Sequence, residues 1–511
     1  MTHDTVSVWI TADQLLRNHP ALAAAEAAVS RANIRVVLLE SHTRLTQHWY
    51  QRKKLVLLLS ALRHYADDLR GAGYVVDHRE VNGFADGLRE HLAQTGSTRL
   101  VVMASAEYAQ WQLQQSLVDA LALPVEILPN TQFLVGSFDP IPNPTPGKRY
   151  VMENFYRAMR REFGVLLDSR GEPEGGRWNF DAENRKPLPK QLDPPAPPIF
   201  APDAATQAVM AKVDALPDMI GSTADFAYAV THAQAAHALD QFITERLPLF
   251  GDYEDAMRAD NATLYHSILS PYLNIGLLEP LQLIRAAEAA YRAGHAPLNA
   301  VEGFVRQIIG WREFMYWQYW RLMPDLLRAN AWQATQPLPE FFWDGQTDMR
   351  CMQHVITRAI DTGYSHHIER LMIVSNFCTL AGITPGEVNN WFLACYIDAY
   401  DWVMPPNVIG MGLNADGGII GTKPYIASAA YINRMSDYCG GCRFNHKQRS
   451  GADACPFNVL YWNFLLTHET QLRANPRFGP AVLGLRRIES DERAAIRADA
   501  ARLLEEYRAR R

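Results

Sequence analysis

The first 135 residues alternate short apolar, β-branched runs with longer amphipathic stretches. The apolar runs lie at residues 6–10, 35–40, 74–76, 99–103 and 125–128. Residues 53–71 and 111–123 carry apolar side chains at helical spacing, and Gly71 and Gly73 mark the end of the first stretch. Strands that alternate with helices predict a parallel sheet with helices on both faces.

A different pattern follows this region. Residues 170–202 contain three glycines and then seven prolines, which predicts a connector. From about residue 223 the apolar periodicity is almost wholly helical. We therefore expect an α/β Rossmann-like domain at residues 1–135, a long linker at 136–222 and a large all-α domain at 223–511.

Charge and hydropathy narrow the classes of protein that fit. The net charge of -6 excludes a uniformly basic coat, so binding to nucleic acid would need a local positive face. The longest strongly apolar stretch, residues 55–62, is too short to span a bilayer, and the first residues lack the pattern of a signal peptide. These features predict a soluble, cytoplasmic protein without a membrane partner.

Polar residues lie at or after the ends of three of the predicted strands. The glycine-rich dinucleotide fingerprint is absent after residue 10, but ligands of parallel sheets still bind at the carboxyl ends of strands. Asp13, Gln14, Glu40 and Glu107 are candidates for such contacts. An equally plausible interpretation makes each of them a polar loop residue or a helix cap.

Four of the six cysteines form the sharpest local signal. Cys439 and Cys442 are three residues apart, and Cys455 follows with a proline behind it. Two such thiolates can reach one metal centre while a third arrives from a loop. Cys351 is our choice for the fourth ligand, because the other two cysteines lie in apolar helical runs. A [4Fe-4S] cluster is favoured by the proline; a structural zinc site is the main alternative, and four unrelated core cysteines are the other.

Three segments of the helical half combine polar and aromatic residues. In residues 265–274, the hydroxyls of Ser267 and Ser270 suit a pyrophosphate, although Ser270 before a proline is also an ordinary helix cap. The other two segments contain a His-His-x-x-Arg run that ends at Arg370 and an Asp-x-x-Asp run that begins at Asp398. A buried Arg and Asp on adjacent helices would need each other as partners.

With these motifs the helical half resembles the cryptochrome/photolyase family. Residues 269–273 resemble its flavin-phosphate segment, residues 311–314 match its Trp-Arg-Glu-Phe motif, and the His-His-x-x-Arg run matches its active-site helix. The resemblance spans nearly the whole chain and implies FAD in the helical domain. The implied FAD-binding residues are Tyr265, His266, Ser267, Leu269, Ser270, Trp311, Glu313, Arg370, Asn376, Asp398, Asp401 and Asn407.

The cysteines and residues 422–425 and 431–435 resemble one branch of the family, the iron-sulfur bacterial cryptochromes and photolyases. Membership implies a [4Fe-4S] cluster on Cys351, Cys439, Cys442 and Cys455. It also implies a 6,7-dimethyl-8-ribityllumazine antenna near Asp13, Gln14 and Glu40, and light-driven repair of (6-4) photoproducts in UV-damaged DNA. The alternatives are a blue-light photoreceptor without repair, a cyclobutane dimer photolyase and, from another class, a zinc-bearing DNA-binding protein.

The resemblance also assigns roles in the reaction. His367 is the expected general acid, with His366 beside it, and Tyr425 and Tyr431 are expected to line the lesion pocket. The expected electron-transfer steps are Trp391 and Trp343, Asp255 is a candidate Mg2+ contact, and a monomer is expected. Two departures stand out: Met404 replaces a Glu that many branch members place near the flavin, and Leu371 replaces the second histidine of animal (6-4) enzymes.

Overall fold

The computed structural model describes residues 4–475 and 482–509. A five-stranded parallel sheet forms near the N-terminus, as the sequence predicts, in the order β3-β2-β1-β4-β5. The register pairs Val8 of β1 with Val36 of β2 and with Val101 of β4. The strands are β1 (Val6–Ile10), β2 (Ile34–Ser41), β3 (Val75–Val81), β4 (Arg99–Met103) and β5 (Val125–Leu128).

Helices cover both faces of this sheet. Trp9, Val37 and Val102 form a core with the helices of one face, and the alternate positions Val8 and Val36 belong to the core of the other face. The inner strands β1, β2 and β4 are buried on both sides, which explains their largely apolar sequences, whereas β3 and β5 at the sheet edges are partly exposed. The first face carries α4 (Phe84–Thr95) and α5 (Tyr108–Ala120); the second carries α1 (Pro20–Ala28) and α3 (Arg52–Gly71).

The predicted linker contains two helices. In α6 (Met152–Glu162) the inward side chains pack against the helical half, and α7 (Ala204–Asp214) packs along α3 of the sheet region. Asp203 caps α7 by accepting a hydrogen bond from the backbone N–H of Thr206. The proline-rich stretch before α7 forms no regular element. The segment between the two halves is thus bound to both of them.

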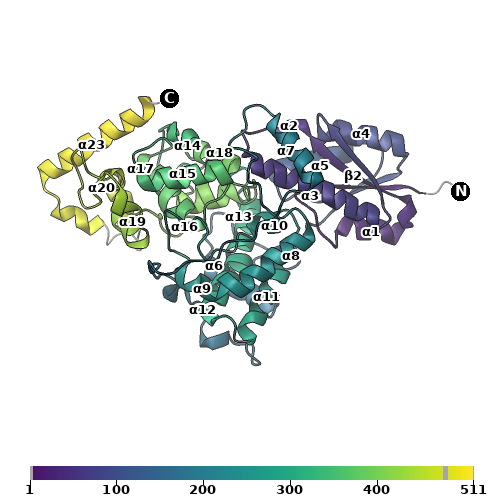
Figure 1. Cartoon of the computed structure of the whole chain (residues 1–511), viewed down its shortest axis with the longest axis horizontal. Helices are drawn as coiled ribbons and strands as arrows, with labels where there is room; N and C mark the ends of the chain where they lie inside the picture. Colours follow the sequence, from purple (N-terminus) through teal and green to yellow (C-terminus); the bar gives the residue numbers. More distant parts are fainter. Residues whose placement is uncertain (1–3, 476–481, 510–511) are drawn as a thin grey trace.

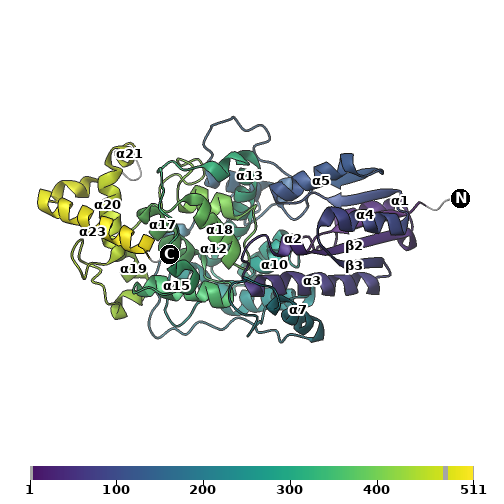
Figure 2. The same cartoon turned by 90° about the horizontal axis from the view of Figure 1, so that it is seen from above.

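The rest of the chain is helical. Figures 1 and 2 show the sheet at one end of the long axis, α23 at the other end and the remaining helices between them. None of the described helices is both long and apolar enough to cross a membrane. The helices that matter for the site are α10 (Ser270–Asn274), α12 (Leu298–Val305), α13 (Glu313–Leu322), α14 (Phe341–Asp344), α15 (Arg350–Thr362), α16 (His367–Glu369), α17 (Asn376–Ala381), α18 (Pro385–Cys395), α19 (Ala429–Met435), α20 (Pro456–Thr467) and α23 (Ser490–Ala509).

A buried lysine joins the sheet region to the helical half. Lys54 of α3 donates to the backbone carbonyl oxygens of Leu393 and Ala399, at 3.1 and 2.6 Å. Its ammonium group also lies 4.7 Å from the ring centre of Tyr50. Burial, assisted by the nearby charge of Arg44, lowers the pKa of Lys54 to about 7.

This lowered pKa predicts a pH-dependent stability. Between pH 7 and about 10.5 the unfolded chain binds one proton more at Lys54 than the folded chain, so this residue makes the free energy of unfolding rise with pH. We expect the difference in that free energy between wild type and Lys54→Met to change by about 3 kcal/mol from pH 7 to 9.5. Urea unfolding at both pH values measures it. The exposed Lys190→Met is the control, and a difference that stays constant with pH would refute the assignment.

Candidate active site

The helical half encloses a cavity of about 320 Å³ that opens to the surface. Three of its walls are wide π-helical turns, η6 (Arg306–Arg312), η8 (Arg370–Ser375) and η9 (Pro406–Gly412). Such turns occur frequently at functional sites, because one inserted residue redirects the side chains around it. The loop at residues 266–270 and the start of α10 supply the remaining polar wall.

The polar loop has an unusual backbone. Leu264 and Ile268 have positive φ angles of 46° and 55°. A β-branched residue such as isoleucine rarely adopts this conformation, which costs on the order of 1–3 kcal/mol. The strain places His266 and Ser267 between these two residues on the cavity wall. Backbone strain of this kind gathers at ligand sites.

An ion pair lies across the cavity wall. Arg370 Nη1 donates to Asp398 Oδ1 at 2.8 Å, and the Ser270 hydroxyl donates to the other carboxylate oxygen at 2.7 Å. Arg370 also lies 3.9 Å from the ring centre of Tyr396. All three polar residues line the cavity. The guanidinium of Arg370 is therefore held in a fixed position at the cavity wall. The Ser270 hydroxyl is already engaged in positioning the Asp398 carboxylate.

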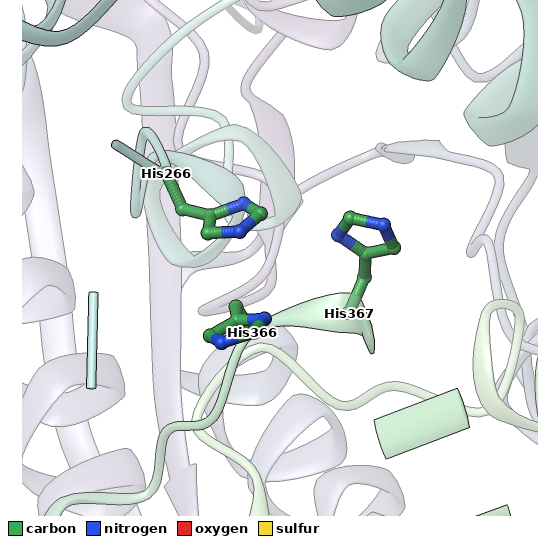
Figure 3. Close-up of side chains that lie close together, drawn as sticks. All are labelled: His266, His366 and His367. Carbon is green, nitrogen blue, oxygen red and sulfur yellow. The ribbon is translucent and has the colours of Figure 1, made fainter. Parts of the chain in front are cut away.

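Three histidines meet at one side of the cavity (Figure 3). The rings of His266 and His366 are stacked, with centroids 4.5 Å apart and planes 10° apart, and His367 meets His266 edge-on at 5.2 Å. Each has a ring nitrogen within 4.8 Å of the others. Imidazole lone pairs lie in the ring plane, so two parallel rings cannot both point at one ion. The stack is unsuited to holding a metal.

The two stacked histidines are buried, whereas His367 is exposed. Burial, with repulsion from neighbouring cationic groups, lowers the pKa of His266 and of His366 well below the usual range. Both are therefore neutral at physiological pH. His367 is different: 47% of its side chain is exposed, and its Nε2 atom lies 3.8 Å from Asp255 Oδ1. His367 is the histidine of this group that an incoming molecule can reach.

Several buried polar atoms at the cavity have no hydrogen-bond partner among the described residues. They are both ring nitrogens of His366, Nε2 of His266, and Nε and Nη2 of Arg312. Buried polar groups in proteins are nearly always paired, so a cluster of unpaired ones indicates a missing ligand. The two unpaired atoms of Arg312 are hydrogen-bond donors, so a ligand that pairs with them carries acceptor oxygens or nitrogens.

Eight of the twelve predicted FAD-binding residues line the cavity, and four do not. The eight are His266, Ser267, Leu269, Ser270, Trp311, Arg370, Asp398 and Asn407. The other four make different contacts: Tyr265 packs on Tyr253, Glu313 accepts from the Val135 N–H, Asn376 pairs with the Ala427 backbone, and Asp401 accepts from the Tyr319 hydroxyl. These four support the walls from behind.

The sequence analysis missed some residues of the cavity wall. Arg312 lies between Trp311 and Glu313 in the Trp-Arg-Glu-Phe motif and belongs to the cavity lining, which Glu313 does not. Its guanidinium donates to Glu313 and lies against the rings of Phe133 and Trp402. Met404 and Leu371, the two departures from the family pattern, both line the cavity. Arg312 could have been predicted as a cavity residue from its place within the Trp-Arg-Glu-Phe motif.

The two predicted lesion-pocket tyrosines lie outside the cavity lining. Tyr431 lies beneath Arg434, whose guanidinium carbon is 5.4 Å from the ring centre, and Lys423 lies 5.5 Å from the ring centre of Tyr425. Burial, with Asp255 nearby, raises the pKa of Tyr431. Tyr431 is therefore close to the side of the site where His367 meets Asp255.

The predicted electron-transfer tryptophans, Trp391 and Trp343, do not line the cavity. Trp391 is buried, and its ring nitrogen donates to the Phe342 carbonyl oxygen at 2.8 Å. Its ring meets Phe392, a residue of the cavity wall, at 5.4 Å. Trp343 is next to Phe342 in the chain, is 36% exposed and contacts Trp49 at 5.5 Å. Aromatic groups thus extend from the cavity to the surface.

The four predicted ligand cysteines surround one small internal cavity. Cys351 comes from α15, Cys439 and Cys442 from the loop at η10 (Tyr438–Gly441), and Cys455 from the residue before α20. Burial, with repulsion among the neighbouring thiolates, raises the pKa of Cys351 well above its usual range. The other two cysteines are buried elsewhere in α17 and α18.

The predicted antenna residues have separate surroundings. Asp13 accepts from the Thr11 hydroxyl, and burial together with Glu107 raises its pKa. Gln14 donates to the Ala104 carbonyl oxygen, and its own buried amide oxygen has no partner among the described residues. Glu40 is already held by the side chains of His78, Arg63 and Lys212. Despite its burial, hydrogen bonds from His78, Arg63 and Lys212 keep the pKa of Glu40 well below its usual range.

Comparison with known proteins identifies relatives over almost the full length. Residues 8–228 match the model of a family described as deoxyribodipyrimidine photo-lyase-related protein. A protein of Agrobacterium fabrum named (6-4) photolyase is 43% identical over 505 residues, which cover 97% of this chain and 98% of that protein.

Solved structures share the fold at much lower sequence identity. A bacterial class III photolyase from Agrobacterium tumefaciens superimposes with a TM-score of 0.58 at 19% identity, over 85% of this chain and 87% of that one. A Synechocystis cryptochrome gives a TM-score of 0.56 at 14% identity, over 85% and 89% of the two chains. The α/β sheet region joined to a helical half is therefore the fold of this group.

Proposed function

Because the chain belongs to the deoxyribodipyrimidine photo-lyase-related family, we propose that it repairs (6-4) photoproducts in DNA with the energy of blue light. The observation that carries this proposal is the cavity in which a buried Arg370–Asp398 pair and an accessible histidine line the same space. The 43% identical relative named (6-4) photolyase supports the choice of lesion. The cryptochrome match supports the fold alone.

The cavity fits FAD by the chemistry of its walls. The unpaired donors of Arg312 suit phosphate oxygens, and Trp311 and Leu269 offer apolar surface for rings. A reduced flavin held there supplies one electron to the lesion when blue light excites it. Arg370 keeps a positive charge at the wall and so stabilises negative charge in the cavity, while Asp398 fixes its orientation.

His367 is proposed as the general acid. Its exposure allows contact with a base that has flipped out of the duplex, and flipping a damaged base is cheap because its stacking and pairing are already weak. An imidazolium at this position donates a proton to the adduct as charge develops there. His366 stays neutral in the wall, and Tyr425 and Tyr431 supply hydrogen bonds or stacking around the lesion.

The remaining cofactor assignments are also proposals. The unpaired amide oxygen of Gln14 and the half-buried Asp13 support a lumazine antenna on the sheet region. The Glu40 carboxylate is held by Arg63 and Lys212, so its proposed role at the antenna site is indirect. Asp255 beside His367 is the proposed Mg2+ contact, and Trp391 and Trp343 are the proposed route for electrons from the surface.

The cysteine site favours an iron-sulfur cluster over zinc. Zinc–sulfur bonds of about 2.3 Å place the sulfurs of a zinc tetrahedron roughly 3.8 Å apart. Among the His, Cys, Asp and Glu side chains of the described residues, one group of three has its ligand atoms all within 4.8 Å of one another, and that group is the three histidines. No three of the cysteine sulfurs therefore lie within 4.8 Å of one another. A [4Fe-4S] cubane holds its four thiolates further apart, which suits Cys351, Cys439, Cys442 and Cys455.

Replacing Cys351 with serine is expected to remove most of the bound iron, because a hydroxyl replaces a thiolate ligand. Iron, sulfide and zinc are measured per chain in protein purified without oxygen. Cys378→Ser is the matched control, since Cys378 is equally buried but lies outside this cavity. Zinc in place of iron in the wild type, or full iron in Cys351→Ser, would refute the cluster assignment.

The proposed function is tested with an oligonucleotide that contains one (6-4) photoproduct. The purified, reduced protein is mixed with it in the dark or under blue light, and the products are separated by chromatography. We expect restored pyrimidines in the light and none in the dark. A flavin that photoreduces normally without any repair would instead indicate a photoreceptor.

A further inference from the structure

Glu369 lies between the catalytic histidines and Arg370 in the sequence, and it is fully buried. Glu369 does not line the cavity, so it has no assigned contact with the flavin or the lesion. Its Oε1 atom accepts two hydrogen bonds of 2.6 Å, one from Arg358 Nη1 and one from the Tyr438 hydroxyl. A buried carboxylate with two strong donors is a fixed point in the structure.

Both donors come from elements that carry cysteine ligands. Arg358 is on α15, seven residues after Cys351, which places both on the same face of that helix about two turns apart. Tyr438 directly precedes Cys439 and itself lines the cysteine cavity. The position of α15 relative to the η10 loop at the cysteines therefore also determines where the two hydrogen-bond donors of Glu369 lie.

The same carboxylate oxygen also faces the histidines. His366 Nε2 lies 3.6 Å from Glu369 Oε1, and no other partner is recorded for either ring nitrogen of His366 among the described residues. His366 in turn stacks on His266, which meets His367 edge-on (Figure 3). A shift of Glu369 would therefore pass through His366 to the whole group.

We propose that Glu369 is a positioning residue that couples the cysteine site to the catalytic histidines, through its hydrogen bonds with Arg358 and Tyr438 and its contact with His366. A metal centre on the cysteines fixes α15 against the η10 loop, and the shared carboxylate transmits that arrangement to His366. The proposal rests on the proposed function for the roles of the histidines. It assigns the cysteine site a part in shaping the reaction cavity.

Arg358 extends the connection to the carboxylate beside His367. Its second terminal nitrogen donates to the carbonyl oxygens of Arg258 and Ala259, at 2.7 and 2.5 Å. That loop follows Asp255, whose carboxylate faces His367. The loop is also tied to the cysteine side, because the Ala259 N–H donates to Asp437. Arg358 therefore binds both Glu369, next to His366, and the loop that follows Asp255, next to His367.

The test compares histidine signals with and without metal. Full-length protein carrying 13C at the histidine ε1 position is studied in the dark without DNA, and His366→Gln assigns the His366 signal. Metal content is measured separately. In the wild type, depleting the cysteine site of metal is expected to move the His366 signal by more than its linewidth. In Glu369→Gln, which keeps the size but loses the charge that holds Arg358, this response is expected to fall at least twofold.

Glu302→Gln is the matched control, because Glu302 is equally buried and hydrogen-bonded but lies away from the cysteines, so its response should equal that of the wild type. Should Glu369→Gln fail to fold, Tyr438→Phe replaces it, with the same reduced response expected. An unmoved His366 signal in the wild type, or a full response in the variant, overturns the proposal. Because light and lesion are absent, failure of the repair activity cannot be confused with this outcome.

Discussion

His367→Ala is expected to lower light-driven repair of a (6-4) photoproduct by at least about 100-fold, because a positioned general acid contributes roughly 10²- to 10⁴-fold. The loss should appear in the rate per absorbed photon and not in binding of the lesion. His367 is exposed at the cavity mouth, so its removal leaves the packed wall intact. Repair is measured under single-turnover conditions, with affinity for the damaged oligonucleotide measured alongside.

The exposed His295 provides the control for this variant, since His295→Ala removes an imidazole far from the cavity lining. It should repair at the wild-type rate. If His367→Ala keeps repair within about threefold of wild type, the proton comes from another group and the assignment fails. Loss of flavin from the variant would show a structural effect, and flavin content is therefore measured in the same samples.

Asp398→Asn is expected to weaken flavin binding at least tenfold and to lower the free energy of unfolding by about 2 kcal/mol. The two partners are largely withdrawn from water, with 16% of the Arg370 side chain and 10% of the Asp398 side chain exposed. Removing one member of such a pair leaves a poorly solvated charge, which costs more than the pair contributes. Flavin fluorescence on release and urea unfolding give the two quantities.

The ion pair between Arg328 and Asp325 offers a contrast, because its side chains are 82% and 92% exposed and 4.0 Å apart. Asp325→Asn should change the free energy of unfolding by well under 1 kcal/mol, as exposed pairs do. Equal losses from Asp398→Asn and Asp325→Asn would mean that the pair at the cavity has no special role.

Most of the sheet could be predicted because its inner strands are short, largely apolar runs, whereas β3 continues to Val81 through polar residues and only its start was predicted. Residues 6–10, 99–103 and 125–128 have the same bounds in the sequence analysis and in the structure. The helix α7 escaped prediction, since the prolines before it suggested a connector. Its capping residue, Asp203, was a local signal that the proline pattern concealed.

Side-chain partners between distant elements could not be predicted. Glu40 ends a central strand, where ligands usually bind, but Lys212 of α7, 172 residues away in the sequence, comes within hydrogen-bonding distance of it. Only the packing of α7 on α3 makes that contact possible. The same holds for Arg358 and Tyr438, which reach Glu369 across separations of 11 and 69 residues.

Motifs located the region of the cavity but not the direction of each side chain. The Trp-Arg-Glu-Phe motif predicted Trp311 and Glu313 as cofactor contacts, but the structure includes Arg312 in the cavity lining and turns Glu313 toward the Val135 backbone. The π-helical turn that ends at Arg312 changes the helical phase there. No spacing rule based on a regular α-helix anticipates that change.

The most direct test of light-driven (6-4) repair is a competition between two lesions. Two oligonucleotides of identical sequence, one with a (6-4) photoproduct and one with a cyclobutane dimer, are mixed with the reduced protein and given a series of blue-light flashes. We expect restoration of the (6-4) substrate with each flash and at least about tenfold less repair of the dimer. Preferential repair of the dimer, or no repair of either lesion while the flavin responds to light, would contradict the proposed function.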